Sequence, residues 1–179
     1  MSEMFEAWPK IPRHKGFQVI VSEKIDGTNA AVVIRDGAMV ACQSRKRIIT
    51  PDEDNYGFAA WAHANEEALV AFLGEGRHFG KWAGEGIQKN PLRLVGKWFF
   101  LFNTSRHDAQ AARALGIGLD VVPVIYSGEA RPGLAVELMA DLAEARAYEP
   151  EGIILYYPST RTFEKATLRA PKGKWAEAA

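Results

Sequence analysis

Apolar and polar residues alternate along residues 17–23, which is the pattern of a β-strand with one buried face. Two further β-prone runs, residues 30–34 and 38–43, flank the dipeptide Asp36-Gly37. Asp-Gly adopts positive φ readily and is typical of tight hairpin turns. The sequence therefore predicts an early strand followed by a β-hairpin.

Residues 55–73 carry apolar side chains at near-helical spacing and end at Gly74, which predicts one amphipathic helix. Stretches rich in Ala, Leu and Glu predict two more helices, at residues 108–115 and 134–147. Further strands are predicted at residues 77–82, 98–103, 121–126, 152–156 and 162–168. Because strands neighbour one another and do not alternate strictly with helices, the pattern favours an α+β fold with mainly antiparallel sheets flanked by helices.

A length of 179 residues indicates about one domain. The 22 basic and 22 acidic side chains cancel, so no overall positive field attracts nucleic acid or an anionic membrane, and any phosphate contact is local. The single Cys42 excludes an internal disulfide and a multi-cysteine metal site. No apolar stretch is long enough for a bilayer, and the first ten residues lack a secretory pattern. We therefore expect a cytoplasmic protein with no membrane contact.

Lys24 and Asp26 stand where the first predicted strand meets a turn, which places an amine at the end of a sheet with a carboxylate two residues on. Alone, this KIDG tetrapeptide is also typical of a solvated lysine beside a turn. Further segments follow it in a fixed order. These segments are SRKR at residues 44–47, FGKWAGEGIQ at 79–88, FFLF at 99–102, EGII at 151–154 and FEKATL at 163–168.

In this order the segments resemble the nucleotidyltransferase motifs of ATP-dependent RNA ligases, and they are most similar to the small phage and bacterial enzymes of the type-2 RNA ligase family. The resemblance spans roughly residues 21–175, and its most specific parts are EKIDGTN, SRKR, WAGEGIQ and EGIIL. It implies that residues 1–179 form a single nucleotidyltransferase (adenylation) domain with no C-terminal accessory domain. It also implies ATP and Mg²⁺ as cofactors, with Mn²⁺ as an alternative metal.

The resemblance implies a covalent mechanism in which the amine of Lys24 attacks the α-phosphate of ATP and forms lysyl-AMP. The AMP then passes to a 5′-phosphate end of RNA, and a 3′-hydroxyl end displaces it to seal the strand. Attack requires an unprotonated amine, which nearby cations favour, and the candidates are Lys165, bound Mg²⁺, and Arg45 or Arg47. RNA with these ends is the expected partner and RNA repair the expected process. Because the net charge is zero, we also expect a partner protein that delivers the RNA.

The same resemblance assigns the remaining site residues. Glu151 is the expected main ligand of the metal or its water, since Mg²⁺ prefers oxygen ligands, and Asp26 either assists the metal or orients the turn that presents Lys24. Phe100 and Phe102 alternate onto one side of their strand, and Phe102 is the expected adenine-stacking residue. The other expected nucleotide-binding residues are Glu23 at the adenine amino group, Asn29 as support, Arg45 at a phosphate, and Lys81.

Two positions depart from the family pattern. The family has a ribose-contacting glutamate at the position of Lys81, and a lysine cannot accept that hydrogen bond, so Glu85 is a candidate substitute. The family also has a second lysine at the position of Thr167. These departures motivate an alternative, a nucleotide- or RNA-end-binding module that has lost turnover. A DNA ligase-like adenylation domain or a guanylyl-transferring capping domain, which share the lysine motif, form a third interpretation.

Overall fold

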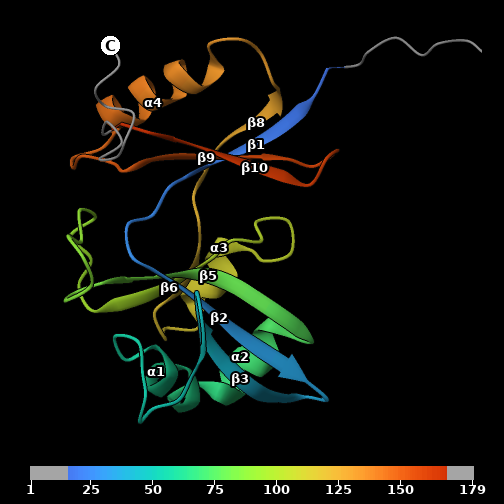
Figure 1. The fold of residues 1–179 in the computed structure, drawn as a ribbon, viewed down its shortest axis with the longest axis vertical. Helices are drawn as coiled ribbons and strands as arrows, with labels where there is room; N and C mark the ends of the chain where they lie inside the picture. The colour runs from blue at the N-terminus through green and yellow to red at the C-terminus, as the bar shows by residue number, and fades with distance from the viewer. Residues whose placement is uncertain (1–15, 169–179) are drawn as a thin grey trace, which may run out of the picture.

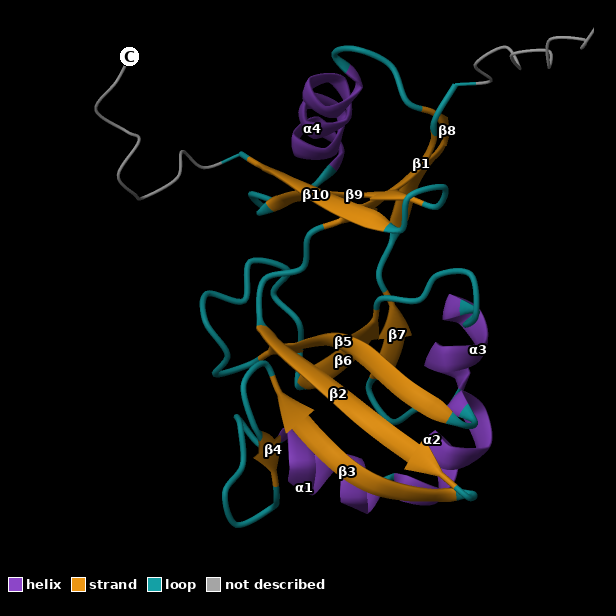
Figure 2. Ribbon diagram, turned by 45° about the vertical axis from the view of Figure 1, so that its right-hand side comes forward, coloured by secondary structure: helices purple, strands orange, loops and turns teal. Residues whose placement is uncertain are grey.

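Two β-sheets face each other in the computed structural model, which describes residues 16–168 (Figures 1 and 2). The smaller sheet has the strand order β10-β9-β1-β8, and the larger sheet has the order β4-β3-β2-β5-β6-β7. Within residues 16–168, every strand pairing is antiparallel except that of β6 with β7, which is parallel. The predicted α+β fold with mainly antiparallel sheets is therefore confirmed.

The strands are β1 (Gln18–Glu23), β2 (Thr28–Arg35), β3 (Ala38–Ser44), β4 (Ile48–Ile49), β5 (Gly76–Gly84), β6 (Lys97–Leu101), β7 (Leu119–Val121), β8 (Val124–Glu129), β9 (Gly152–Tyr157) and β10 (Thr162–Thr167). The helices are α1 (Phe58–Ala64), α2 (Glu66–Leu73), α3 (Ala109–Ala114) and α4 (Leu134–Ala145). Among residues 16–168, no helix combines the length and the apolar content that a bilayer crossing requires.

The larger sheet buries one face against α1, α2 and α3. Phe58 of α1 lies at the centre of this core, with ring centroids 5.4 Å from Trp82 of β5 and 4.9 Å from Phe99 of β6. The predicted hairpin is also confirmed in this sheet, because β2 and β3 pair across Asp36 and Gly37, whose φ angles are 53° and 73°. The opposite face of the larger sheet faces the smaller sheet.

The smaller sheet is covered on its outer side by α4 (Figure 2). Val19 and Val21 of β1 pack against Leu134, Leu138 and Leu142 of this helix. Successive side chains of a strand point to opposite faces, so Ile20 and Ser22, which alternate with these valines, face the larger sheet. Each sheet therefore has one face in a helix-covered core and one face toward the other sheet.

The chain crosses between the sheets twice within the described residues, once from β1 to β2 and once from β7 to β8. The two crossings lie side by side, because the backbone N–H of Glu23 donates to the carbonyl of Pro123 at 2.9 Å. Ile25 and Val122, one from each crossing, are buried with Ala83 and Phe100 in a small apolar cluster. Lys24 is thus held on a crossing segment between the two sheets.

Two sequence-based predictions of elements are wrong. The helix predicted over residues 55–73 is two helices, because Asn65 leaves the helical conformation at φ −121° and ψ 20° and its side chain donates to the carbonyl of Trp61. The strand predicted over residues 121–126 is two strands in different sheets. Pro123 lies between them and has no N–H for a ladder bond, so the pairing ends there.

Candidate active site

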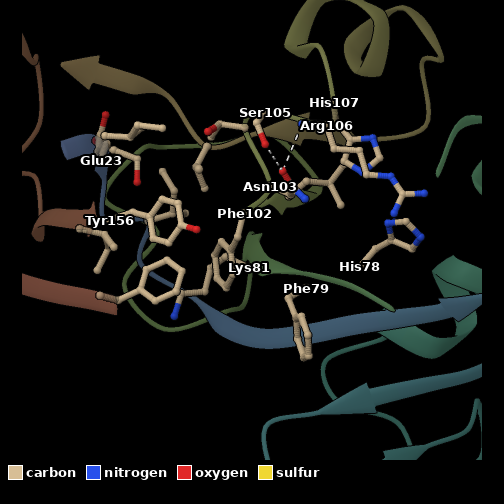
Figure 3. Close-up of a pocket in the computed structure, with 18 of the residues that line it drawn as sticks. Glu23, His78, Phe79, Lys81, Phe102, Asn103, Ser105, Arg106, His107 and Tyr156 are labelled. Atoms are coloured by element: carbon tan, nitrogen blue, oxygen red, sulfur yellow. Dashed lines mark hydrogen bonds between the residues drawn. The ribbon is translucent and has the colours of Figure 1, made fainter. Parts of the chain in front are cut away.

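A cavity of about 690 Å³ lies between the two sheets, a size typical of small-molecule sites (Figure 3). Ile20 and Ser22 line it from alternate positions of β1, and Glu23, Lys24 and Ile25 follow at the end of this strand. The other lining residues come mainly from β5, β9 and the segment after β6. They include Asn29, Arg77, His78, Phe79, Lys81, Phe102, Asn103, Thr104, Ser105, Arg106, His107, Ile154, Tyr156 and Phe163.

Lys24, which lines the cavity, forms an ion pair with Glu151, which lies outside the lining, and 16% and 33% of their side chains are exposed. The strand pairing brings them together, since β1 lies beside β9 and the backbone N–H of Lys24 donates to the carbonyl of Gly152 at 2.9 Å. Two residues far apart in sequence are therefore held in fixed register, with an amine and a carboxylate in contact.

Two glycines allow the close packing around this pair. Gly27 follows Lys24 in the turn at φ 156°, and a Cβ there would overlap the carbonyl of Trp82. Gln88 holds the same turn by donating its amide to the Gly27 carbonyl at 2.7 Å. Gly152, next to Glu151, has φ 145° and lies directly against the Ala166 backbone. Glycine is needed at both positions because any side chain would push the nucleophile segment away from its neighbours.

Lys81 reaches the same end of the cavity from the opposite sheet. Its ammonium donates to the Asn29 Oδ1 at 2.9 Å. Burial lowers the pKa of Lys81, and the charge of Lys24 lowers it further, whereas the carboxylates of Glu151 and Asp26 raise it. One lysine and two carboxylates therefore act electrostatically on Lys81, and Arg45 also lowers its pKa.

Aromatic side chains from both sheets line the walls of the cavity (Figure 3). Phe102 and Phe79 come from the larger sheet and are about half exposed. Tyr156 and Phe163 come from the smaller sheet and stack on each other with ring centroids 4.6 Å apart. Phe100 is buried in the apolar cluster between the sheets, so of the two phenylalanines on that side of the strand, Phe102 is the one that lines the cavity.

Glu23 is almost fully buried, at 2% exposure, and its carboxylate is held by two residues that sequence reasoning did not identify. Arg146 donates from Nε at 3.0 Å and from Nη2 at 2.6 Å, and the Tyr148 hydroxyl donates to the other carboxylate oxygen. No local pattern indicates these partners, although a buried carboxylate requires partners of this kind. That Glu23 also contacts the adenine amino group stays a prediction.

The remaining predicted site residues are absent from the cavity lining, and so are Glu151 and Asp26. Lys165 is exposed on β10, where it pairs with Ile154 of β9. Arg45 is exposed just after β3, and Arg47 donates instead to the carbonyls of Glu53 and Asp54. The candidate substitute Glu85 is exposed and is also absent from the cavity lining, whereas its backbone N–H donates to the Gly96 carbonyl.

Glu151 and Asp26 are the two carboxylates whose charges raise the pKa of Lys81. Within residues 16–168, no group of three or more His, Cys, Asp or Glu side chains gathers around a common point. A pair of carboxylates fits Mg²⁺ better than zinc, because Mg²⁺ uses one or two protein carboxylates and keeps several waters or phosphate oxygens.

Comparisons with known proteins show the family and a similar fold. The family model described as RNA ligase matches residues 17–172. A search of curated proteins finds no match. Two similar solved structures are Naegleria gruberi RNA ligase carrying an arginine-to-alanine substitution, with ATP and Mn (TM-score 0.65, 20% identity), and the ligase with PPi (TM-score 0.63, 21% identity).

Each of these structures aligns with 86% of this chain and with 50% of its own chain. The chain therefore spans about half the length of the solved structures it matches. At this level of identity the likeness establishes the fold, that is, the arrangement of the two sheets.

Proposed function

Because the chain belongs to the RNA ligase family, we propose that it is an ATP-dependent RNA ligase that forms a lysyl-AMP intermediate at Lys24. The observation that carries this proposal is the position of the Lys24 amine, which is paired with Glu151 at a cavity of about 690 Å³. A cavity of this size accommodates a nucleotide, and a lysine amine beside it can act as a nucleophile.

In the first step, the Nζ of Lys24 attacks the α-phosphorus of ATP. A nitrogen–phosphorus bond forms and the bond from that phosphorus to the bridging oxygen of pyrophosphate breaks. The nitrogen releases one proton to solvent before attack and another as the bond forms, and it keeps its last N–H in lysyl-AMP. Glu151 orients the amine before attack, since the two groups are in contact. The rigid pairing of β1 with β9 fixes this geometry before ATP binds.

The aromatic walls and the polar residues of the cavity are suited to the rest of the nucleotide. Phe102 offers a half-exposed ring on which adenine stacks, and Asn29 supports the same end of the cavity together with Lys81. Glu23 contributes to adenine recognition, and Arg45 contacts phosphate. Glu151 and Asp26 would hold a divalent metal, Mg²⁺ or Mn²⁺, which neutralises negative charge on the phosphates.

In the later steps, an oxygen of an RNA 5′-phosphate attacks the phosphorus of lysyl-AMP and displaces Lys24. A 3′-hydroxyl then attacks the activated 5′-phosphate, and AMP leaves as the phosphodiester forms. Lys165 lies on the strand beside β9 and supplies positive charge to these phosphates. Repair of cleaved RNA, a cytoplasmic location and a protein that delivers the RNA belong to the same proposal.

Lys81 and Thr167 favour a second candidate function, a module that binds a nucleotide or an RNA end without turnover. The cavity would then be retained for binding, while the altered cation positions prevent the covalent step. The two functions differ in one observable property, the transfer of AMP from ATP to the protein and onward to RNA.

A pulse-chase experiment tests the proposal. The protein is first incubated with Mg²⁺ and ATP labelled at the α-phosphate, freed of unbound nucleotide, and then mixed with a nicked RNA duplex. We expect the label to appear on the protein and to move to RNA that carries a 5′-phosphate. A matched nick with a 5′-hydroxyl, and Lys24→Ala protein, are the controls.

Label that stays on the protein in the presence of every RNA would contradict the proposed RNA step. Transfer to a DNA nick in preference to RNA would favour a DNA ligase-like activity. Absence of any labelled protein, with AMP binding intact, would support the binding module.

A further inference from the structure

The Lys81 ammonium has more donors than the protein uses. Within residues 16–168, Asn29 is its one hydrogen-bond acceptor, and an ammonium has three N–H donors. Asn29 is neutral, and Glu151, the nearby carboxylate, is in contact with Lys24. Two of the three donors of Lys81 are therefore left for a bound molecule.

The charges along the cavity wall indicate what kind of molecule this is. The charged residues that line the cavity are Lys24, Lys81, Arg77, Arg106 and Glu23. Glu23 is the one acidic residue in this lining, and Arg146 and Tyr148 hold its carboxylate. The lining therefore presents cations to a ligand, which favours an anion.

Lys24 and Lys81 line the same cavity from different parts of the fold, which narrows the choice of ligand group to one phosphate. The carboxylates of Glu151 and Asp26 favour the charged form of Lys81, but burial and the charge of Lys24 disfavour it and lower its pKa. A negative group placed between the two lysines would relieve both effects, since an anion offsets the cost of burying a cation. In lysyl-AMP, the phosphate that meets this condition is the one attached to Lys24.

We propose that Lys81, oriented by Asn29, binds the α-phosphate of the nucleotide and stabilises the phosphate joined to Lys24. This inference rests on the proposed function and adds a catalytic residue to it. Lys81 would bind phosphate and not ribose. Its ammonium, which reaches the cavity from the larger sheet, would place a positive charge at the reacting phosphorus.

Binding of AMP and of adenosine separates phosphate contact from sugar or base contact, because the two ligands differ only in the phosphate. Isothermal titration calorimetry would measure both ligands with the native chain, Lys81→Met, Lys81→Arg and Lys89→Met. Methionine keeps most of the side-chain volume without the charge, and arginine keeps the charge. Lys89 is an exposed lysine absent from the cavity lining, so it is the matched control.

We expect Lys81→Met to weaken AMP binding about tenfold or more, as the loss of a hydrogen bond between charged groups predicts, and to leave adenosine binding within about twofold of native. Lys81→Arg should restore most of the AMP affinity, and Lys89→Met should change neither ligand. The rate of lysyl-AMP formation from ATP should fall in Lys81→Met and recover in Lys81→Arg.

An equal loss of AMP and adenosine binding in Lys81→Met would overturn the inference, because it would assign Lys81 to the sugar or base or to the fold. Unchanged AMP binding would overturn it as well. In either case, lysyl-AMP formation by the native chain would leave the proposed function standing. A native chain that binds neither ligand and forms no lysyl-AMP would contradict the proposed function together with this inference.

Discussion

The carboxylate of Glu23 accepts two hydrogen bonds from the guanidinium of Arg146, across 123 positions of sequence. Glu23 directly precedes Lys24, and Arg146 directly follows α4 on the segment that leads to Glu151. The Glu23–Arg146 pair and the Lys24–Glu151 pair therefore join the same two segments of backbone. Together they fix the amine that we propose as the nucleophile.

Replacing Arg146 with methionine should destabilise the fold by about 3 kcal/mol, because it leaves a buried carboxylate without its charged partner. Chemical denaturation followed by fluorescence measures this change. Arg131→Met is a matched control, since Arg131 pairs with Glu137 and both side chains are about half exposed. The control should lose much less stability than Arg146→Met.

A double-mutant cycle strengthens this test. Glu23→Gln removes the negative charge that pairs with Arg146. Arg146→Met should therefore lower the free energy of unfolding clearly less in the Glu23→Gln background than in the native one. Equal costs in both backgrounds would show that Arg146 stabilises the fold through some contact other than Glu23.

Gly152→Ala should destabilise the fold by about 2 to 3 kcal/mol, because a Cβ at φ 145° would overlap the Ala166 backbone of the neighbouring strand. It should also slow lysyl-AMP formation, since it displaces Glu151 from Lys24. Gly86→Ala is the matched control, with φ 73° and open space around its Cβ, and should cost about 1 kcal/mol. Similar stability of the two variants would contradict the close packing described for Gly152.

Phe102→Ala should weaken AMP binding about 10- to 100-fold, the effect expected for removal of one stacked aromatic ring. The fold should be little affected, because the Phe102 side chain is 44% exposed. Calorimetric titration measures the affinity, and Tyr56→Ala is the control, since Tyr56 is an exposed aromatic residue outside the cavity lining. Native affinity in Phe102→Ala would move the adenine slot to another aromatic residue such as Phe79.

The stability of the protein should fall in mild acid because of His107. Burial lowers the pKa of His107 from 6.5 to about 4, and the charges of His78 and Arg106 act in the same direction. The unfolded chain therefore takes up a proton near pH 6.5 that the folded chain takes up only near pH 4. The stability from this group is present above pH 6.5 and is lost as the pH falls toward 4.

Between pH 7.5 and pH 5, the different proton uptake of His107 in the folded and unfolded chain lowers the free energy of unfolding by about 2 kcal/mol. Urea unfolding of native protein and His107→Phe at both pH values measures it, and the variant should lose less stability on acidification. His63→Phe is the control, because His63 is about half exposed. An acid-induced loss in His107→Phe as large as that in native protein would contradict the assignment to His107.

Much of the fold is predictable from the sequence, because its elements have local signals. The alternation around Val19 and Val21 and the turn at Asp36-Gly37 are examples, and both predictions are confirmed. The break at Asn65 was missed because the apolar spacing of a helix continues across it. The change of sheet at Pro123 was missed because the two short strands form one apolar run.

For the candidate site, the sequence predicts several of the residues but not the contacts that hold them. The motif order brought Lys24, Glu151, Asn29, Lys81 and Phe102 to attention, and the structure places them at or beside one cavity. The partners of Glu23 were missed because Arg146 and Tyr148 are brought to it only by the packing of the segment after α4. The hydrogen bond between Lys81 and Asn29 likewise depends on the register of β2 with β5, which no local pattern specifies.

The most direct test of the account is the intact mass of the protein after incubation with ATP and Mg²⁺. We predict that the native chain gains the mass of one AMP and that Lys24→Ala, shown to be folded, gains none. A folded native chain without an adduct from ATP, or an equal adduct on Lys24→Ala, would contradict the claim that Lys24 is the nucleophile.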